Sequence, residues 1–140
     1  MVDLAKLQDS LGTLTIKANE PLSNYTYTKT GGPADLLVFP RSVQEVQRVL
    51  AAVKQENLPL TVLGNASNLI VKDGCIRGLV MILTDMQELV LEGNQLKAAS
   101  GAALIEASRQ AAAAGLTGLE FACGIPGSIG GAIYMNAGAY

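Results

Sequence analysis

Two segments of the 140-residue sequence carry residue types that can bind a phosphate group through the backbone. The first is VLGNASNLIV, Val62–Val71, in which Gly64 and four small or polar residues separate two apolar runs. Glycine permits a positive φ, and Asn, Ala and Ser are compatible with a turn. Successive N–H groups in such a turn form a concave nest that holds phosphate oxygens without lysine. An ordinary connection between two strands is the alternative interpretation of the same residues.

The second segment is GIPGSIGGA, Gly124–Ala132, whose glycines let the backbone pass close to a bulky ligand. We expect Ser128 to cap a short helix that begins near Ile129 and directs free N–H groups at an anion. Close backbone packing without a ligand is one alternative. A membrane helix is another, since Gly127 and Gly131 form a GxxxG pair in an uncharged stretch, but a proline and an asparagine within that stretch disfavour it.

Composition excludes several other kinds of site. The chain has no histidine, so it cannot build a Ser-His-Asp triad, and no metal site is expected. Cys75 and Cys123 lie far apart without a CxxC spacing, and reduced thiols are expected. The net charge is −2 and the basic residues are scattered, which argues against a nucleic-acid partner. Neither GxGxxG nor GxxxxGK[ST] occurs, so a dinucleotide here requires an architecture other than the Rossmann fold.

The elements that must position the two loops begin with an amphipathic helix over residues 4–11, which Gly12 ends. It lacks the apolar region of a signal peptide, so we expect a cytoplasmic protein with no membrane partner. A buried strand is predicted over 34–39, and a helix over 43–56 begins at a capping box of Ser42 and Glu45. With a strand over 60–63, these elements form a β-α-β unit.

The rest of the chain is predicted to contain short apolar runs, one further strand and an alanine-rich helix that ends before Gly115. These segments lie at residues 69–71, 78–83, 88–91, 95–100 and 103–114. The pattern changes near Thr84, from the β-α-β unit to short strands and the alanine-rich helix. This change indicates a possible boundary between two units.

Four motifs, in this order, resemble the UDP-N-acetylmuramate dehydrogenase family of bacterial cell-wall synthesis, also known as the UDP-N-acetylenolpyruvoylglucosamine reductases or MurB. They are T-K-T-G-G-P-A-D (Thr28–Asp35), the Val62–Val71 segment, the Gly124–Ala132 segment and M-N-A-G-A-Y (Met135–Tyr140). The resemblance implies an α+β fold, the FAD-binding domain of the vanillyl-alcohol-oxidase (PCMH) type, made of two α+β subdomains. It places the first subdomain at 1–83 and a truncated second one at 84–140, with the substrate-binding domain absent.

The resemblance also implies that the two loops clasp FAD at its pyrophosphate, ribityl chain and isoalloxazine. The cofactor-binding residues it carries over are Gly64, Asn65, Ala66, Ser67, Asn68, Leu69, Ile125, Pro126, Gly127, Ser128, Gly130, Gly131, Asn136, Ala137, Gly138 and Tyr140. One position departs from the family, because many members have glycine where Ala66 stands. We expect alanine there to adopt an ordinary φ and still to donate its N–H group.

In the family, NADPH reduces the flavin, and the reduced flavin passes the hydride to the enolpyruvyl group of a UDP-sugar. A serine acid then supplies a proton, while an arginine and a glutamate stabilise the enolate. Those residues follow the matched segment in the family, so no catalytic residue is expected in this chain, and we expect it to be inactive alone. NADPH and the UDP-sugar are expected to bind only with the missing domains. Another flavin oxidoreductase of the same architecture and a non-catalytic binding module are the alternative functions.

Overall fold

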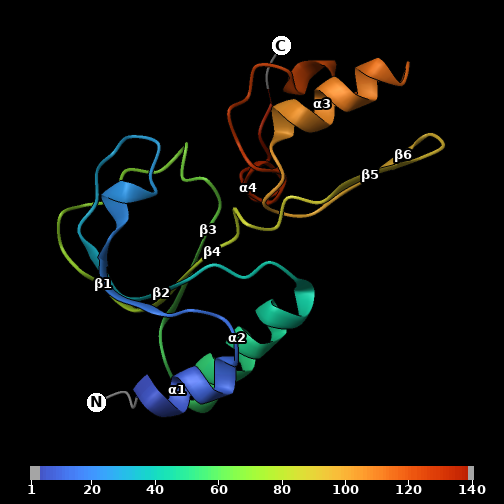
Figure 1. The fold of residues 1–140 in the computed structure, drawn as a ribbon. Coiled ribbons are helices and arrows are strands. Elements are labelled where there is room, and N and C mark those ends of the chain that lie inside the picture. The colour runs from blue at the N-terminus through green and yellow to red at the C-terminus, as the bar shows by residue number, and fades with distance from the viewer. Residues whose placement is uncertain (1–3, 139–140) are drawn as a thin grey trace.

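In the computed structural model, which describes residues 4–138, the chain forms a four-stranded sheet and a separate two-stranded hairpin, each accompanied by helices (Figure 1). The larger sheet contains β1 (Lys17–Pro21), β2 (Pro33–Val38), β3 (Leu60–Leu63) and β4 (Ile76–Ile82), in the order β1-β2-β4-β3. β1 is antiparallel to β2, whereas β2 and β3 both run parallel to β4. The carboxyl ends of these three parallel strands therefore meet at one edge of the sheet, where α/β proteins commonly bind ligands.

The predicted β-α-β unit is present, and the sheet inserts a further strand into it. The helix α2 (Val43–Gln55) connects β2 to β3, as the capping box and the two apolar runs predict. β2 and β3 are not neighbours, because β4 lies between them and pairs with both. A central parallel strand is covered on both faces, which explains the uninterrupted apolar run Leu79–Ile82 in β4.

Apolar side chains fill both faces of the larger sheet and alternate along its strands with a period of two. On one face, α1 (Leu4–Leu11) and α2 cover a cluster made of Leu7, Leu11, Leu14, Leu36, Val38, Val49, Ala52, Val53, Leu79 and Met81. The other face holds a cluster made of Leu22, Ala34, Leu37, Leu63, Val80 and Ile82, beside the short helix η1 (Leu22–Asn24). Burying one Leu or Val side chain stabilises a fold by about 1.5–3 kcal/mol, so the two clusters anchor the strands whose ends carry the loops.

Two predicted helix boundaries are confirmed. Gly12 follows α1 with a φ of 64°. Ser42 caps α2, and its hydroxyl oxygen accepts the N–H of Glu45 at 3.2 Å. The second half of the capping box differs from the usual form, because the Glu45 carboxylate accepts the N–H of Arg41, at 2.6 Å, one residue before the cap. Two hydrogen bonds between side chain and backbone, one made by Ser42 and one by Glu45, therefore stabilise the start of α2.

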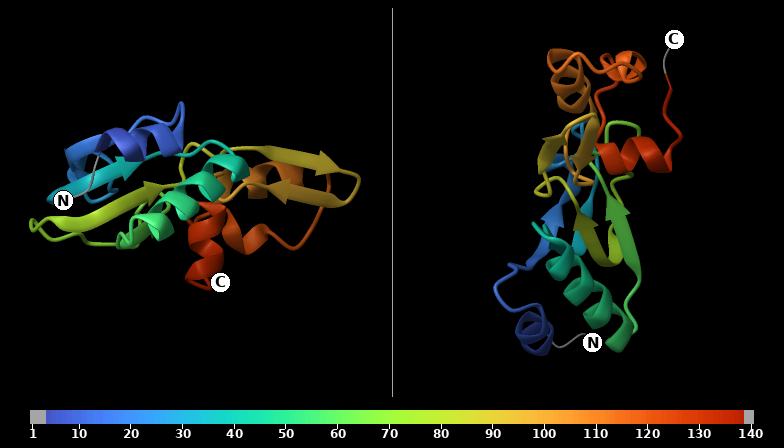
Figure 2. Two further views of the ribbon diagram at one scale, coloured as in Figure 1. Left: turned by 90° about the horizontal axis from the view of Figure 1, so that it is seen from below. Right: turned by 90° about the vertical axis from the view of Figure 1, so that its right-hand side faces the viewer.

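The second part of the chain contains the antiparallel hairpin of β5 (Leu89–Glu92) and β6 (Gln95–Ala98), which projects away from the larger sheet (Figure 2). It is followed by α3 (Leu104–Ala113), the short helix η2 (Glu120–Ala122) and α4 (Ile129–Tyr134). α3 matches the predicted alanine-rich helix. Gly115, at a φ of 70°, lies just beyond its end.

Two predicted segments differ from the structure. The strand expected over 95–100 ends at Ala98, and the apolar run at 69–71 forms no strand. Ile70 in that run is 83% exposed. Because β4 is parallel to β3, the chain must return along the length of the sheet before β4 begins, and residues 69–75 make this return without a strand partner.

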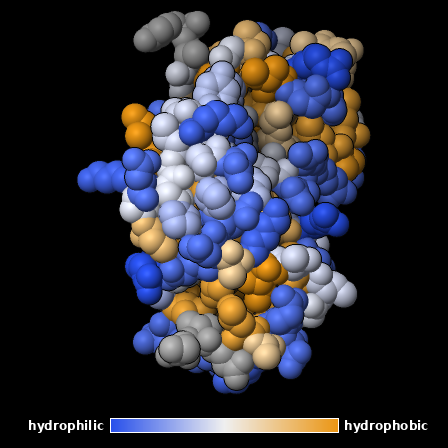
Figure 3. Space-filling view, turned by 60° about the vertical axis from the view of Figure 1, so that its left-hand side comes forward, coloured by the Kyte–Doolittle hydropathy of each residue, from blue (hydrophilic) through white to orange (hydrophobic). Residues whose placement is uncertain are grey.

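No helix within residues 4–138 combines the length and the apolar character needed to cross a bilayer. The face shown in Figure 3 carries polar residues over its middle, and apolar residues gather toward its two ends.

Candidate functional site

The first loop, residues 64–68, leaves the carboxyl end of β3 at the edge where the parallel strands end. The buried Leu63 anchors its beginning in the core. Within the described chain, the backbone N–H groups of residues 65–68 donate to no protein acceptor. Residues 64–71 also include no acidic side chain. The loop therefore offers several backbone donors to an anion, as its residue types predict.

Ala66 corrects one expectation about this loop. Alanine was expected to adopt an ordinary φ there, but Ala66 has a φ of 49°, in the left-handed region that favours glycine. Its side chain is only 6% exposed, so the methyl group is buried under the loop. The turn therefore keeps a left-handed backbone conformation at residue 66 even though this residue is alanine and not glycine.

The second loop, residues 124–128, connects η2 to α4, and the predicted cap at Ser128 is confirmed. The Ser128 hydroxyl oxygen accepts the N–H of Gly131 at 3.3 Å. The expectation of free N–H groups at the start of α4 is wrong. Ile129 donates to the carbonyl of Ala102 and Gly130 to that of Ser100, both at 2.8 Å.

The reason is that the second loop runs alongside residues 100–104. Ala103 and Ser128 form an isolated antiparallel bridge, and the N–H of Leu104 donates to the carbonyl of Gly127 at 2.9 Å. Gly130 lies so close to Ser100 that an added Cβ would stand 3.0 Å from the Ser100 carbonyl oxygen. The donors of this loop are therefore used to hold the loop in place.

The two loops contact each other across the edge of the sheet. The Asn65 side-chain amide donates to the carbonyl of Pro126 at 2.8 Å. A Cβ added to Gly64 would collide with the buried hydroxyl of Ser128, so the first loop needs glycine at this point to approach the second. Residues 61 positions apart in sequence are thus brought together as one site.

A cavity of about 300 Å³ opens where the loops meet. Its lining includes three of the predicted cofactor-binding residues, Asn65, Gly127 and Ser128. The other lining residues are Thr84, Gln87, Leu89, Gly101, Ala103 and Glu106, none of which the sequence indicated as site residues. They come from the connection between β4 and β5, from β5 itself and from both sides of the start of α3, which the motifs did not connect to the loops.

The remaining predicted residues within the described chain are not among those that line this cavity. Gly64, Ala66, Ser67, Asn68 and Leu69 belong to the first loop and its return segment, and Ile125, Pro126, Gly130 and Gly131 to the second loop and α4. Asn136, Ala137 and Gly138 follow α4, where the N–H of Ala137 donates to the carbonyl of Ala132 at 2.9 Å. Tyr140 lies outside the described residues.

Glu106, in the first turn of α3, is the acidic residue of the cavity lining. Its carboxylate accepts two hydrogen bonds from Arg109, at 2.7 and 2.9 Å, and one from the Gln110 amide at 3.0 Å. The hydrogen bonds from Arg109, followed by that from Gln110, lower the pKa of Glu106 to about 2. The cavity therefore contains a carboxylate that is ionised at neutral pH and neutralised by its own helix.

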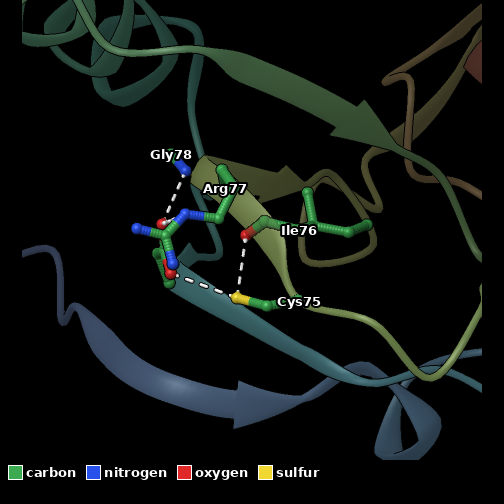
Figure 4. A network of polar contacts seen from close by, with 5 residues as sticks. Cys75, Ile76, Arg77 and Gly78 are labelled. Atoms are coloured by element: carbon green, nitrogen blue, oxygen red, sulfur yellow. Dashed lines mark hydrogen bonds and ion pairs between the residues drawn. The ribbon is translucent and has the colours of Figure 1, made fainter.

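The segment that returns from the first loop, residues 69–75, and the start of β4 are held by the T-K-T-G-G-P-A-D motif, for which sequence suggested no role. The N–H of Gly32 donates to the carbonyl of Lys72 at 2.9 Å. The Asp35 carboxylate accepts the N–H of Gly78 at 3.0 Å and the thiol of Cys75 at 3.1 Å (Figure 4). Asp35 also forms an ion pair with Arg77 at 3.2 Å. The segment that returns from the first loop is therefore fixed to β2 before it enters β4.

This network shifts two pKa values in opposite directions. The hydrogen bond from the Gly78 N–H, and then that from the Cys75 thiol, lower the pKa of Asp35 below its ordinary value. The hydrogen bond that the exposed Cys75 thiol donates to the Asp35 carboxylate raises the pKa of the thiol, because it stabilises the protonated form, and the negative charge of Asp35 acts in the same direction. Cys75 is therefore a weakly acidic thiol that donates a hydrogen bond.

The residues at this edge fit the cofactor that the resemblance implies. A pyrophosphate needs several donors, and residues 65–68 offer N–H groups that have no other acceptor in the described chain. Gly64 lets the first loop approach the second closely, and Gly127 and Ser128 line the cavity beside them. This arrangement offers the donors that a diphosphate needs, without the Rossmann fingerprint.

Comparison with known proteins agrees with this fit. Residues 34–140 match the family model described as an FAD binding domain. The chain is 60% identical over 128 residues to UDP-N-acetylenolpyruvoylglucosamine reductase of Latilactobacillus sakei, a match that covers 91% of this chain and 42% of the relative. The crystal structure of UDP-N-acetylenolpyruvylglucosamine reductase (MurB) from Thermus caldophilus matches with a TM-score of 0.70 at 33% identity, over 90% of this chain and 43% of that one. The chain thus spans less than half the length of these relatives.

A more distant structure shows the fold alone. Phl p 4.0202, a glucose dehydrogenase, matches 79% of this chain and 26% of its own, with a TM-score of 0.60 at 13% identity. The predicted α+β fold of the vanillyl-alcohol-oxidase type is confirmed, as is the resemblance to the reductase family. Since the family model covers most of the sequence, the chain belongs to the family of FAD binding domains.

Proposed function

We propose that this chain is the FAD-binding part of the NADPH-dependent reductase that converts UDP-N-acetylenolpyruvoylglucosamine to UDP-N-acetylmuramate in peptidoglycan synthesis. The 60% identity to a reductase of that name supports the assignment. The observation that carries it is the row of unpartnered N–H groups at residues 65–68, facing a second loop that the Asn65–Pro126 hydrogen bond holds in place.

In this proposal the two loops have different tasks. Residues 65–68 donate their N–H groups to the pyrophosphate, and Asn65 also fixes the distance between the loops. Ser128 caps α4 and is one of the residues that line the cavity. The second loop and α4 form a wall that positions the cofactor and excludes water. When bound, FAD supplies the hydride-transfer chemistry, and these residues supply its position.

Two further proposals concern the organisation of the protein. We place the boundary between the two FAD-binding subdomains near Thr84, between the larger sheet and the β5–β6 hairpin. We also propose that NADPH and the UDP-sugar act with parts of the relatives that lie outside the matched segment. The 140-residue chain is then expected to show no reductase activity by itself, and the full reductase is expected to be cytoplasmic.

The test is direct titration of the purified 140-residue chain with FAD. Binding is expected to quench flavin fluorescence and shift the visible spectrum, and circular dichroism checks that the chain is folded. A folded chain that leaves FAD unchanged contradicts the proposal and favours a non-catalytic module. The same sample is then assayed for NADPH oxidation with the enolpyruvyl substrate, where turnover would contradict the expectation that catalysis needs further domains.

A further inference from the structure

The cavity between the loops contains a carboxylate at a place where the proposed ligand carries negative charge. Glu106 lines the same cavity as Asn65 and Ser128, and its side chain is 38% exposed. A carboxylate and a phosphate both only accept hydrogen bonds, and their charges repel each other. Glu106 is therefore better matched to a ligand group that donates a hydrogen bond than to a phosphate oxygen.

The geometry of Glu106 leaves it one open acceptor position. A carboxylate has about four lone-pair sites. Arg109 occupies one on each oxygen, at 2.7 and 2.9 Å, and Gln110 occupies a second site on Oε1, at 3.0 Å. Oε2 therefore keeps one unused site. The three donors come from the next turn of α3, so they orient the carboxylate with respect to the helix.

The ion pair with Arg109 also makes the position compatible with a diphosphate nearby. Because the guanidinium neutralises Glu106, the long-range repulsion of a phosphate is weakened, while the acceptor character of the carboxylate is kept. With a pKa of about 2, the Glu106 carboxylate is ionised at neutral pH. A ligand group that donates a hydrogen bond matches this environment.

We propose that Glu106 accepts a hydrogen bond from a sugar hydroxyl of the bound cofactor and so sets its orientation across the cavity. The inference rests on the proposed function. FAD carries donor hydroxyls on its adenosine ribose and on its ribityl chain, and both present the same chemistry to a carboxylate. The first loop takes the pyrophosphate, and Glu106 takes the hydroxyl-bearing segment beside it. A cavity of about 300 Å³ is at the lower end of the range for ligand pockets, roughly 300–1,000 Å³, so it suits one part of a dinucleotide.

The test compares the FAD affinity of the 140-residue chain with that of Glu106→Gln, by calorimetry at pH 7. The variant keeps the size of the side chain and removes the charge on the acceptor. Because a hydrogen bond to a charged group is worth more than a neutral one, we expect FAD to bind about tenfold more weakly. Glu92→Gln is the matched control, since Glu92 forms an exposed ion pair with Lys97 at 2.6 Å on the hairpin and does not line the cavity.

The binding of two smaller ligands, ADP and riboflavin, identifies which hydroxyl-bearing part of FAD contacts Glu106. If the partner is the adenosine ribose, Glu106→Gln weakens the binding of ADP and leaves that of riboflavin unchanged. If the partner is the ribityl chain, riboflavin loses affinity and ADP does not. Either pattern supports the inference and identifies which part of FAD occupies the cavity.

The outcomes separate this inference from the proposed function. A parent chain that is folded but binds none of FAD, ADP and riboflavin overturns both. A parent chain that binds FAD, with Glu106→Gln binding equally well or more tightly, overturns only the inference, since Glu106 would then be neutral toward the ligand or repel it. An unchanged unfolding curve for Glu106→Gln confirms that any loss of affinity arises at the ligand.

Discussion

The two glycine-bearing loops at the edge of the sheet use their backbone N–H groups in opposite ways. In the first loop, residues 65–68 donate to no acceptor within the described chain. In the second loop and the first turn of α4 that follows it, Ile129 and Gly130 donate to the carbonyls of residues 102 and 100, and Gly131 donates to the capping hydroxyl of Ser128. The first loop thus offers its donors to a ligand, and the second has already used most of its donors to stabilise the protein.

The glycines do not follow this division, because protein contacts require glycine in both regions. Gly64 is needed because the second loop approaches it, and Gly130 is needed because residue 100 does. Neither glycine is explained by a ligand alone. An uncharged, glycine-rich segment therefore indicates a close approach of backbone, and only the pattern of hydrogen bonds shows whether the approaching group is a ligand or another part of the chain.

The strongest test of this comparison is Gly130→Ala, which should damage the second loop without involving any ligand. The added Cβ would stand 2.9 Å from the Cβ of Ser100 and 3.0 Å from its carbonyl oxygen. Overpacking of this kind costs about 1–3 kcal/mol of unfolding free energy. Urea denaturation of the chain without FAD measures the loss.

Gly124→Ala is the matched control, because a Cβ at Gly124 meets no atom within 4 Å. Its unfolding free energy should stay within about 0.5 kcal/mol of that of the parent chain. Equal stability of the two variants would show that the second loop is not a packed structural element, and the contrast between the loops would be lost.

The next largest effect is expected for Asn65→Ala, which separates the loops from each other. The variant removes the 2.8 Å hydrogen bond to the Pro126 carbonyl and leaves the N–H groups of the first loop intact. We expect the unfolding free energy to fall by about 1 kcal/mol and FAD to bind about tenfold more weakly. Fluorescence titration with FAD measures the second effect.

Asn94→Ala provides the comparison, since Asn94 lies in the turn between β5 and β6 and makes no side-chain hydrogen bond in the described chain. An Asn65→Ala variant that binds FAD as well as Asn94→Ala does would mean that the second loop does not position the first.

Much of the fold could be predicted, because its signals are local. The capping box at Ser42 marked the start of α2, Gly12 and Gly115 marked helix ends, and the apolar runs marked β2 and β3. The position of β4 between β2 and β3 could not be predicted, since strand order depends on contacts between residues far apart in sequence.

The site was predicted less completely, for a physical reason. The two loops were recognisable from their glycine and small polar residues, but the cavity also includes Thr84, Gln87 and Glu106. These residues carry no motif, and only the folded chain brings them to the loops. The hydrogen bonds to residues 100 and 102 were missed for the same reason, so the N–H groups of α4 were expected to be free.

A smaller effect is expected in the segment that returns from the first loop, where Asp35 holds Cys75. Because the Asp35 carboxylate raises the pKa of the thiol, Asp35→Asn should lower that pKa toward its ordinary value. The thiolate fraction at pH 8 then increases, since thiolate forms as the pH rises toward the pKa. We therefore expect Cys75 to react faster with a thiol reagent in the variant.

The experiment uses a Cys123→Ser background, so that Cys75 is the thiol that reacts. Asp9→Asn, on α1 and away from the network, serves as the control. Equal reaction rates with and without the Asp35 carboxylate would show that the return segment is not held by Asp35 in solution. Addition of FAD to the parent chain should slow the reaction of Cys75 with the thiol reagent, because a ligand bound at residues 65–68 steadies the segment that follows them.

The smallest expected effect concerns Ala66, where opposing contributions nearly cancel. Glycine relieves the left-handed backbone at a φ of 49°, a gain of about 1–2 kcal/mol. It also removes a buried methyl group, worth about 0.8 kcal/mol, and increases the freedom of the unfolded chain by a further 0.4–1 kcal/mol, roughly. Ala66→Gly should therefore change the unfolding free energy by less than about 1 kcal/mol and leave FAD affinity unaltered, because every N–H group of the loop remains.

Ala66→Val separates the contributions, since a β-branched residue is strained at positive φ and adds bulk to a buried position. If valine is tolerated as well as glycine, residue 66 is not left-handed in solution, and the unpartnered N–H groups that distinguish the first loop from the second would have to arise from another backbone conformation.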